Sequence, residues 1–168
     1  MQRLPTLLHS CARAATASEA RFRVDYPNSK TRATRIIGLD PAAVSILDRI
    51  SAEPWKGAHF LTYRGLGNFS ADGPDAVLES LAGGTSRLSD ELDGADVAIM
   101  VATSDEGAEA ASIIGDACFL RRIMTAGLVV GDGTRVDQAV TALRPFASVL
   151  VVSADEGYVL EVLGALRA

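Results

Sequence analysis

The sequence predicts an α/β protein with a doubly wound, mostly parallel sheet of five strands in the Rossmann-like order 2-1-3-4-5. Short apolar stretches typical of buried strands alternate with stretches of helical spacing through the last three quarters of the 168 residues. Strands separated by helices imply right-handed crossovers, and these produce a parallel sheet with helices on both faces. We expect one domain over residues 34–168, preceded by an N-terminal helix or extended arm over residues 1–33.

The first unit is the clearest. Residues 34–39 (TRIIGL) are predicted as a buried strand, and Asp40-Pro41 then supplies an N-cap followed by a proline at the first helical position. The helix that follows, PAAVSILDRISAE, has apolar residues along one side. A second strand is predicted over residues 58–63, followed by an irregular, glycine-containing stretch over residues 64–73.

The later units repeat this rhythm. Two short helices are expected before the third strand, and each later strand is followed by a helix. The predicted strands are 96–102, 126–130 and 148–152, and the predicted helices are 75–81, 86–92, 106–123, 135–143 and 157–166. The first and third strands are expected to be neighbours.

Charge is divided unevenly along the chain. Residues 1–35 hold seven Arg and Lys against two acids, whereas residues 36–168 hold nine against nineteen. An acidic body argues against nucleic acid as the main partner, because nucleic-acid binding needs a dense basic face. The apolar runs are too short to span a bilayer, so no membrane partner is expected.

The two cysteines, Cys11 and Cys118, stand apart and have no neighbouring histidine cluster. This spacing predicts reduced thiols and a cytoplasmic protein, with neither a disulfide framework nor a zinc site. The basic leader before residue 25 leaves three alternatives open: a helix that packs on the domain, a flexible arm, or a targeting segment.

The candidate site follows from the predicted strand order. In a doubly wound sheet the ligand crevice lies beyond the carboxyl ends of the strands where the winding direction reverses, here the first and third strands. The second strand ends beside them. The predicted ligand-binding residues are Gly38, Asp40, Arg64, Thr103, Ser104, Asp105 and Gly107. The sequence identifies no catalytic residue and no metal ligand among them.

Acidic residues gather at these strand ends and allow two interpretations. Asp40, Asp105, Glu106, Asp132, Asp155 and Glu156 could form a rim that holds Mg²⁺ through oxygen ligands. Alternatively they cap helices, since Thr103 to Glu106 and Ser153 to Glu156 both fit the capping-box pattern. The capping interpretation needs no ligand.

Standard nucleotide and nucleophile motifs are missing from the sequence. There is neither a GxGxxG fingerprint nor a P-loop, Pro41 removes an amide donor, and Asp40 places a negative charge where a pyrophosphate would bind. No Gly-x-Ser-x-Gly elbow is present, and His59 is predicted as a packed strand residue. Cys118 lies in an apolar helix and is predicted as a buried, inert thiol.

Two segments resemble the nucleotide-binding half of the tubulin/FtsZ family. Residues 35–50 (RIIGLDPAAVSILDRI) are similar to its first strand, phosphate loop and first helix, and residues 92–110 (LDGADVAIMVATSDEGAEA) to its Gly-Ala-Asp, strand and signature loop. The resemblance implies GTP binding at Gly38, Thr103, Ser104 and Gly107. The family's loops are rich in glycine, whereas these read GLDPAA and TSDEGAEA, and this departure argues against GTP binding here.

Three functions remain open from the sequence. The first is a domain that binds a small molecule, such as an anionic metabolite or a nucleotide, with an unknown cofactor and an undetermined reaction. The second is a noncatalytic interaction or oligomerisation protein, and the third is a Mg²⁺-dependent enzyme that uses the acidic rim. A homodimer is expected because the final helix is apolar around more than half of its circumference. Its apolar residues are Tyr158, Val159, Leu160, Val162, Leu163 and Leu166.

Overall fold

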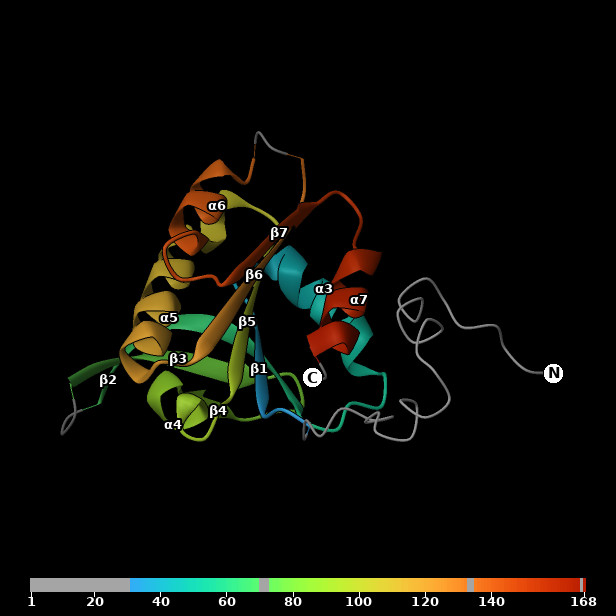
Figure 1. Cartoon of the computed structure of the whole chain (residues 1–168). Coiled ribbons are helices and arrows are strands. Elements are labelled where there is room, and N and C mark those ends of the chain that lie inside the picture. Colours follow the sequence, from blue (N-terminus) through green and yellow to red (C-terminus); the bar gives the residue numbers. More distant parts are fainter. Residues whose placement is uncertain (1–30, 70–72, 133–134, 167) are drawn as a thin grey trace, which may run out of the picture. The chain divides into compact units, whose positions relative to one another are not determined.

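A computed structural model of the chain describes residues 31–69, 73–132, 135–166 and 168 (Figure 1). The arm or helix predicted for residues 1–33 therefore lies outside the described residues except for its last three. The description below concerns the domain that begins at Thr31.

The domain is built on a seven-stranded mixed sheet with the order β4-β3-β2-β1-β5-β6-β7. β1 pairs in parallel with β2 and β5, and β6 pairs in parallel with β5 and β7. β3 and β4 add an antiparallel extension beside β2. The strands are β1 (Thr34–Gly38), β2 (Ala58–Phe69), β3 (Gly73–Ser80), β4 (Thr85–Arg87), β5 (Val97–Ala102), β6 (Met124–Val130) and β7 (Val149–Ser153).

The α/β class and the adjacency of β1 and β5 are confirmed, but the prediction of a five-stranded sheet is wrong. The helix predicted over residues 75–81 is strand β3. β4 takes the first two residues of the helix predicted over residues 86–92, and the remainder is the helix α4 (Leu88–Leu92). Ala76 and Leu78 of β3 are buried at alternate positions, which is the period of a strand. Positive φ angles at Gly83 and Gly84 then turn the chain back.

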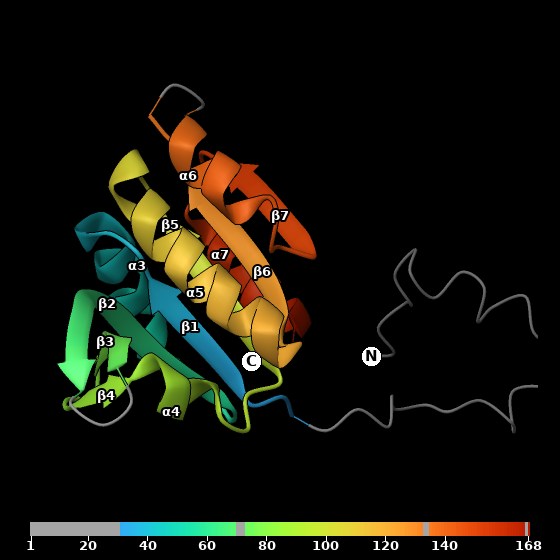
Figure 2. The same ribbon diagram turned by 90° about the vertical axis from the view of Figure 1, so that its left-hand side faces the viewer.

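Helices cover both faces of the sheet (Figure 2). α5 and α6 lie on one face, together with α4, and α3 and α7 lie on the other. The helices are α3 (Pro41–Ser51), α4 (Leu88–Leu92), α5 (Ala108–Arg121), α6 (Asp137–Leu143) and α7 (Gly157–Leu166), and a 3₁₀ turn, η2 (Asp105–Gly107), precedes α5.

Alternation along the central strands produces two separate cores. On β1, Ile36 faces α3 and α7 whereas Ile37 faces α4, α5 and α6. Both side chains are fully buried. A strand covered on both faces needs apolar residues at every position, which explains the continuous apolar runs in β1 and β5.

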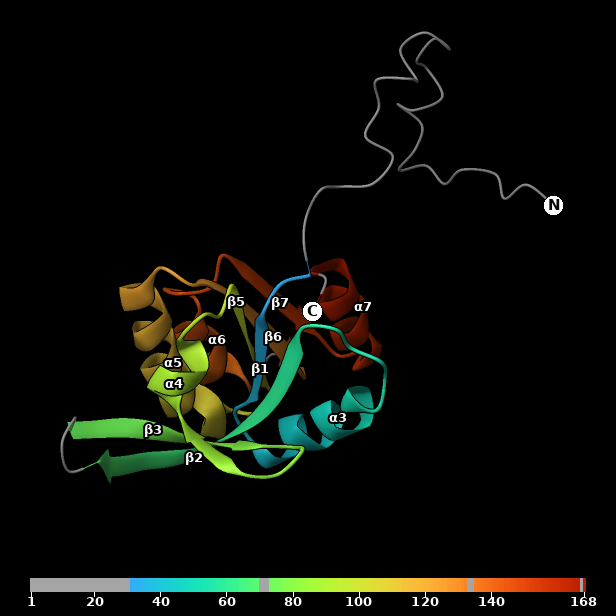
Figure 3. The same ribbon diagram turned by 90° about the horizontal axis from the view of Figure 1, so that it is seen from below.

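β2 and β3 form a long antiparallel ribbon that extends past the helices (Figure 3). The pairing register shifts between Tyr63 and Gly65, where Gly65 has a φ of +113°. The irregular stretch predicted over residues 64–73 is therefore wrong for residues 64–69, which continue β2 beyond a bulge. None of the helices in the described part of the chain has the length and apolar character that crossing a bilayer requires.

Candidate functional site

The carboxylate of Asp40 links the ends of β1 and β5. Its Oδ1 accepts hydrogen bonds from the Ala43 amide at 2.9 Å and the Thr103 hydroxyl at 2.5 Å. Its Oδ2 accepts from the amides of Thr103 at 2.6 Å and Ser104 at 3.2 Å. Asp40 is 5% exposed, so the carboxylate is buried with four donors around it. This matches the N-cap expected from the sequence and adds two partners that sequence spacing did not predict.

These donors are the groups that would bind a phosphate at this end of the sheet. Amides at a helix N-terminus and in the following loop attract anions. Here the chain supplies its own anion, because Asp40 occupies the amides of Ala43, Thr103 and Ser104. A phosphate in the same place would have to displace a buried carboxylate and overcome its negative charge.

The remaining predicted residues on the β5 side have structural partners. Asp105 Oδ1 accepts hydrogen bonds from the amides of Gln138 at 2.8 Å and Ala139 at 3.1 Å, and so caps α6. A Cβ on Gly107 would lie 2.8 Å from Leu39 Cβ, so the glycine allows η2 to approach β1 closely. The capping box predicted for Thr103 to Glu106 does not form, because the Thr103 hydroxyl donates to Asp40 instead.

The acidic rim does not assemble into a metal centre in the part of the chain that the structure describes. No group of three or more His, Cys, Asp or Glu side chains converges there. Asp40 and Asp105 accept hydrogen bonds from amides, and Glu156 pairs with Arg49 of α3. The Asp155 Oδ1 atom accepts from the Gly157 amide at 2.8 Å. Helix and loop amides therefore hold several of the carboxylates that a Mg²⁺ site would need.

A cavity of about 210 Å³ lies between β1, β2 and α3, next to Asp40. It brings together three predicted site residues, Gly38, Asp40 and Arg64. Thr103, Ser104, Asp105 and Gly107 do not line it. The full lining comprises Gly38, Leu39, Asp40, Pro41, Val44, Thr62, Tyr63 and Arg64.

Thr62 is the lining residue that sequence reasoning missed. It is 6% exposed, and its Oγ1 atom has no hydrogen-bond partner among the described residues. Leaving a buried hydroxyl unpaired costs about 1–3 kcal/mol, which makes such groups uncommon in folded proteins. The only signal in the sequence was a threonine within an apolar strand, and that pattern does not distinguish a paired hydroxyl from an unpaired one.

The charges around the cavity are largely paired. Arg64 Nε donates to Glu79 on the neighbouring strand β3, and both side chains are exposed. Burial raises the pKa of Tyr63 above its ordinary value, and the negative charge of Glu109 raises it further. The Tyr63 phenol therefore stays protonated at neutral pH. Asp40 is the buried acid among the residues that line the cavity.

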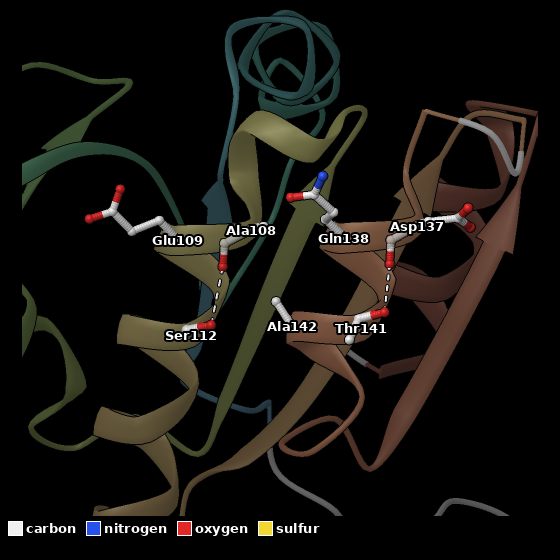
Figure 4. Close-up of a pocket in the computed structure, with 7 residues that line it drawn as sticks. All are labelled: Ala108, Glu109, Ser112, Asp137, Gln138, Thr141 and Ala142. Atoms are coloured by element: carbon white, nitrogen blue, oxygen red, sulfur yellow. Dashed lines mark hydrogen bonds between the residues drawn. The ribbon is translucent and has the colours of Figure 1, made fainter.

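A larger groove of about 560 Å³ lies between the first turns of α5 and α6 (Figure 4). Its hydroxyls are already used within their own helices: Ser112 donates to the Ala108 carbonyl at 3.2 Å and Thr141 to the Asp137 carbonyl at 2.7 Å. Ala142 points into the groove, and Glu109 points away from it (Figure 4). We therefore take the smaller cavity beside Thr62 as the candidate site.

Comparison with known proteins produced no match, either to a protein-family model or to a curated protein.

Proposed function

We propose that this domain binds a small neutral or cationic molecule in the cavity between β1, β2 and α3. The observation that supports it most directly is the unpaired hydroxyl of Thr62. Thr62 lines the cavity with its Oγ1 atom shielded from solvent, so a rotation of the side chain about χ1 would present the hydroxyl to a ligand that offers a hydrogen-bonding atom, while Leu39, Pro41 and Val44 provide apolar contact. The combination of an apolar wall with a few convergent polar groups is characteristic of small-molecule sites.

The size of the cavity limits the ligand. Pockets for drug-sized molecules measure about 300–1,000 Å³, whereas this cavity measures about 210 Å³. At about 30 Å³ per water molecule it corresponds to roughly seven waters. A dinucleotide would have to lie mostly outside it, so a small metabolite with a short apolar part fits better.

Charge favours a ligand without a phosphate. The tubulin/FtsZ resemblance would put GTP phosphates against the loops after β1 and β5, where Asp40 already occupies the amides. A bare anion in the cavity would also lie close to the Asp40 carboxylate, and Arg64 offsets little of this because Glu79 shares its charge. A neutral or cationic head group avoids this repulsion.

A matched series of probes tests the proposal. Butanamide, butylammonium and butyrate differ only in the head group, and each can be titrated into the ¹⁵N-labelled chain. We expect the amide or the ammonium, but not butyrate, to shift the amide resonances of Thr62 and Val44. Thr62→Val keeps the shape and removes the hydroxyl, so it should weaken amide binding by about tenfold, the value of one hydrogen bond.

Stability supplies the control for this variant. Because the Thr62 hydroxyl is unpaired without ligand, Thr62→Val should raise the free energy of unfolding by about 1 kcal/mol. Thr125 is equally buried, but its hydroxyl donates to the Phe146 carbonyl, so Thr125→Val should lower that free energy by about 1–3 kcal/mol. Binding that is equal for all three probes, or unaffected by Thr62→Val, would refute the proposed site.

A second candidate function is self-association through β7. This strand ends the sheet as far as the described residues go, and Val149 and Val152 on it are 43% and 47% exposed. Tyr158 and Leu160 of the following helix are also exposed, whereas Val159 and Leu163 are buried in the core. An apolar edge strand without charge can pair with a second copy.

The free, buried thiol of Cys118 suits a reducing, cytoplasmic setting.

A further inference from the structure

A chain of polar side chains connects five elements at the other end of β2. His59 of β2 lies 2.8 Å from Glu91 of α4 through Nδ1, and 3.3 Å from the Ser80 hydroxyl of β3 through Nε2. Arg35 of β1 lies 3.2 Å from the same Glu91 oxygen, and Ser86 of β4 donates to the other at 2.8 Å. Glu91 is 12% exposed, and the His59 side chain is 41% exposed.

The partners of His59 determine which ring nitrogen carries the proton. An ionised carboxylate only accepts hydrogen bonds, so Nδ1 must donate its proton to Glu91. In the neutral ring Nε2 is then an acceptor, and the Ser80 hydroxyl donates to it. Arg35 and Ser86 hold the carboxylate from two further sides, which keeps the ring oriented. This is the arrangement in which an acid, a histidine and a serine produce an activated nucleophile.

The antiparallel strand β3 creates this arrangement. Because β3 runs against β2, its carboxyl end lies beside the start of β2, and Ser80 pairs in register with Leu61. Ser80 and His59 both line a cavity of about 210 Å³, together with Ser51, Phe60, Leu81 and Ala82. His59 was predicted from the sequence as a packed strand residue, whereas its side chain is 41% exposed.

We propose that Ser80 and His59 are the catalytic residues of an acyl-transfer site for small esters, with Glu91 as the positioning residue. The Ser80 oxygen attacks the ester carbonyl carbon as its proton passes to His59 Nε2. The bond from that carbon to the alcohol oxygen then breaks, and His59 returns the proton to the alcohol. Water gives a proton to His59 as its oxygen attacks the acyl carbon. The bond from that carbon to Ser80 Oγ then breaks, and His59 returns the proton to Ser80 Oγ as the acid leaves.

One backbone N–H group lies beside the nucleophile. The Ala82 amide donates to Ser80 Oγ at 3.2 Å without substrate, and it would have to turn to the carbonyl oxygen of the ester to stabilise the oxyanion. The amides of Leu81 and Gly83 donate to the carbonyls of Phe60 and Ser80. With one donor rather than two, the site is expected to turn over slowly, and covalent capture is a sharper readout than turnover.

A fluorophosphonate tests the nucleophile directly. Ser80 Oγ would bond to phosphorus, fluoride would leave, and His59 would take the proton. We expect mass spectrometry of the full-length wild-type chain to find the adduct on Ser80, and Ser80→Ala to carry none. His59→Gln should slow labelling by at least about 100-fold, as expected for loss of a general base.

Ser45→Ala is the matched control, because it removes an exposed hydroxyl that donates to the Pro41 carbonyl on α3, outside the polar cluster around His59. It should label at a rate within about threefold of wild type. A wild-type chain without an adduct at Ser80 would overturn the proposal without any variant being needed. Labelling of Ser80 that is unchanged in His59→Gln would overturn the role of the histidine.

The positioning role of Glu91 has a spectroscopic test. The chain has two histidines, so His9→Gln leaves the ¹⁵N ring signals of His59 alone. We expect these signals to show the Nδ1–H tautomer, and Glu91→Gln to shift the population toward Nε2–H and to slow labelling. A structural role alone would leave the tautomer unchanged in a folded variant.

Discussion

At the scale of single residues, Asp40 couples two loops that are distant in sequence. Its carboxylate accepts the amides of Ala43, three residues away, and of Thr103, sixty-three residues away. Hydrogen bonds to a charged acceptor contribute about 1.5–3 kcal/mol each when buried. Asp40 thus stabilises the strand ends while excluding other anions from them.

Asp40→Asn should therefore be strongly destabilising. An asparagine presents one oxygen and an NH₂ group, so at least one buried amide loses its acceptor and faces another donor. We expect the free energy of unfolding, measured in urea, to fall by about 3–5 kcal/mol. Asp155→Asn is the control, because this exposed carboxylate accepts from the Gly157 amide and the asparagine oxygen can accept the same hydrogen bond. Its free energy of unfolding should change by no more than about 0.5 kcal/mol. If both variants lowered the free energy of unfolding by the same amount, the hydrogen bonds to Asp40 would not stabilise the fold as proposed.

The prediction that Cys118 is buried is confirmed, because its side chain on α5 is fully shielded from solvent. Burial raises the pKa of Cys118 to about 12, although the charge of Arg121 partly lowers it. The thiolate is the reactive form, so a thiol held protonated is inert.

In the Cys11→Ser variant, Ellman's reagent at pH 8 should leave the folded protein unmodified and react on unfolding.

The raised pKa of Cys118 also links the stability of the fold to pH. The Cys118 thiol ionises near pH 9 in the unfolded chain but only near pH 12 in the folded chain. Between these two pH values ionisation therefore stabilises the unfolded state relative to the folded state. Stability should fall by about 1.4 kcal/mol per pH unit there, and Cys118→Ala should lack this component. Rapid labelling of the folded chain by Ellman's reagent would contradict the prediction that Cys118 is inert.

At the scale of elements, the β2–β3 ribbon depends on the bulge at Gly65. Its φ of +113° is a conformation that side chains other than glycine rarely adopt. Apart from Gly65 and its two chain neighbours, no heavy atom of the described residues lies within 4 Å of the position that a Cβ would occupy, so a substitution meets conformational strain but no clash.

Gly65→Ala should lower the free energy of unfolding by about 1–3 kcal/mol through backbone strain alone. Gly164→Ala is the matched control, because Gly164 lies in α7 without a positive φ and also has open space around its Cβ. Alanine is the better helix former there, so this variant should gain about 0.5–1 kcal/mol. Thermal or urea unfolding measures both. Two changes of the same sign would be inconsistent with a strained bulge.

At the scale of the whole molecule, the described domain has two sheet edges of different character. The β4 edge is short and bears Arg87, whereas the β7 edge reads VLVVS and is uncharged. Natural sheets protect edges with charge or with very short strands, and β7 lacks charge. Pairing of β7 with β7 in a second copy would be symmetric and would cover Val149 and Val152.

Sedimentation equilibrium should therefore report a particle of about twice the 17.6 kDa chain mass at micromolar concentration. Val152→Lys places a charge on the edge and should return the chain to the monomer mass. Leu66→Lys changes a side chain that is 59% exposed on β2, away from this edge, and should leave the dimer intact. A monomer at all concentrations in the wild type would exclude the β7 dimer.

The sequence by itself determined the α/β class, the five strands that pair in parallel, and the Asp40-Pro41 start of α3. These features depend on local periodicity and capping, which neighbouring residues specify on their own. It also indicated that the ends of β1 and β5 would meet, because adjacent parallel strands end at one edge.

Only the tertiary structure decided what those ends can do. Whether Asp40 faces a ligand or accepts the amides of Thr103 and Ser104 depends on the register of β1 against β5, which local pattern does not specify. The hairpin of β3 and β4 was missed because short segments of mixed polarity satisfy helical and strand spacing equally, and pairing with β2 decides between them. The same pairing brings Ser80 to His59, and the Thr62 hydroxyl has no hydrogen-bond partner among the described residues. Long-range contacts form both candidate sites. The sequence predicted Gly38, Asp40 and Arg64 of the cavity and did not predict the polar cluster around His59.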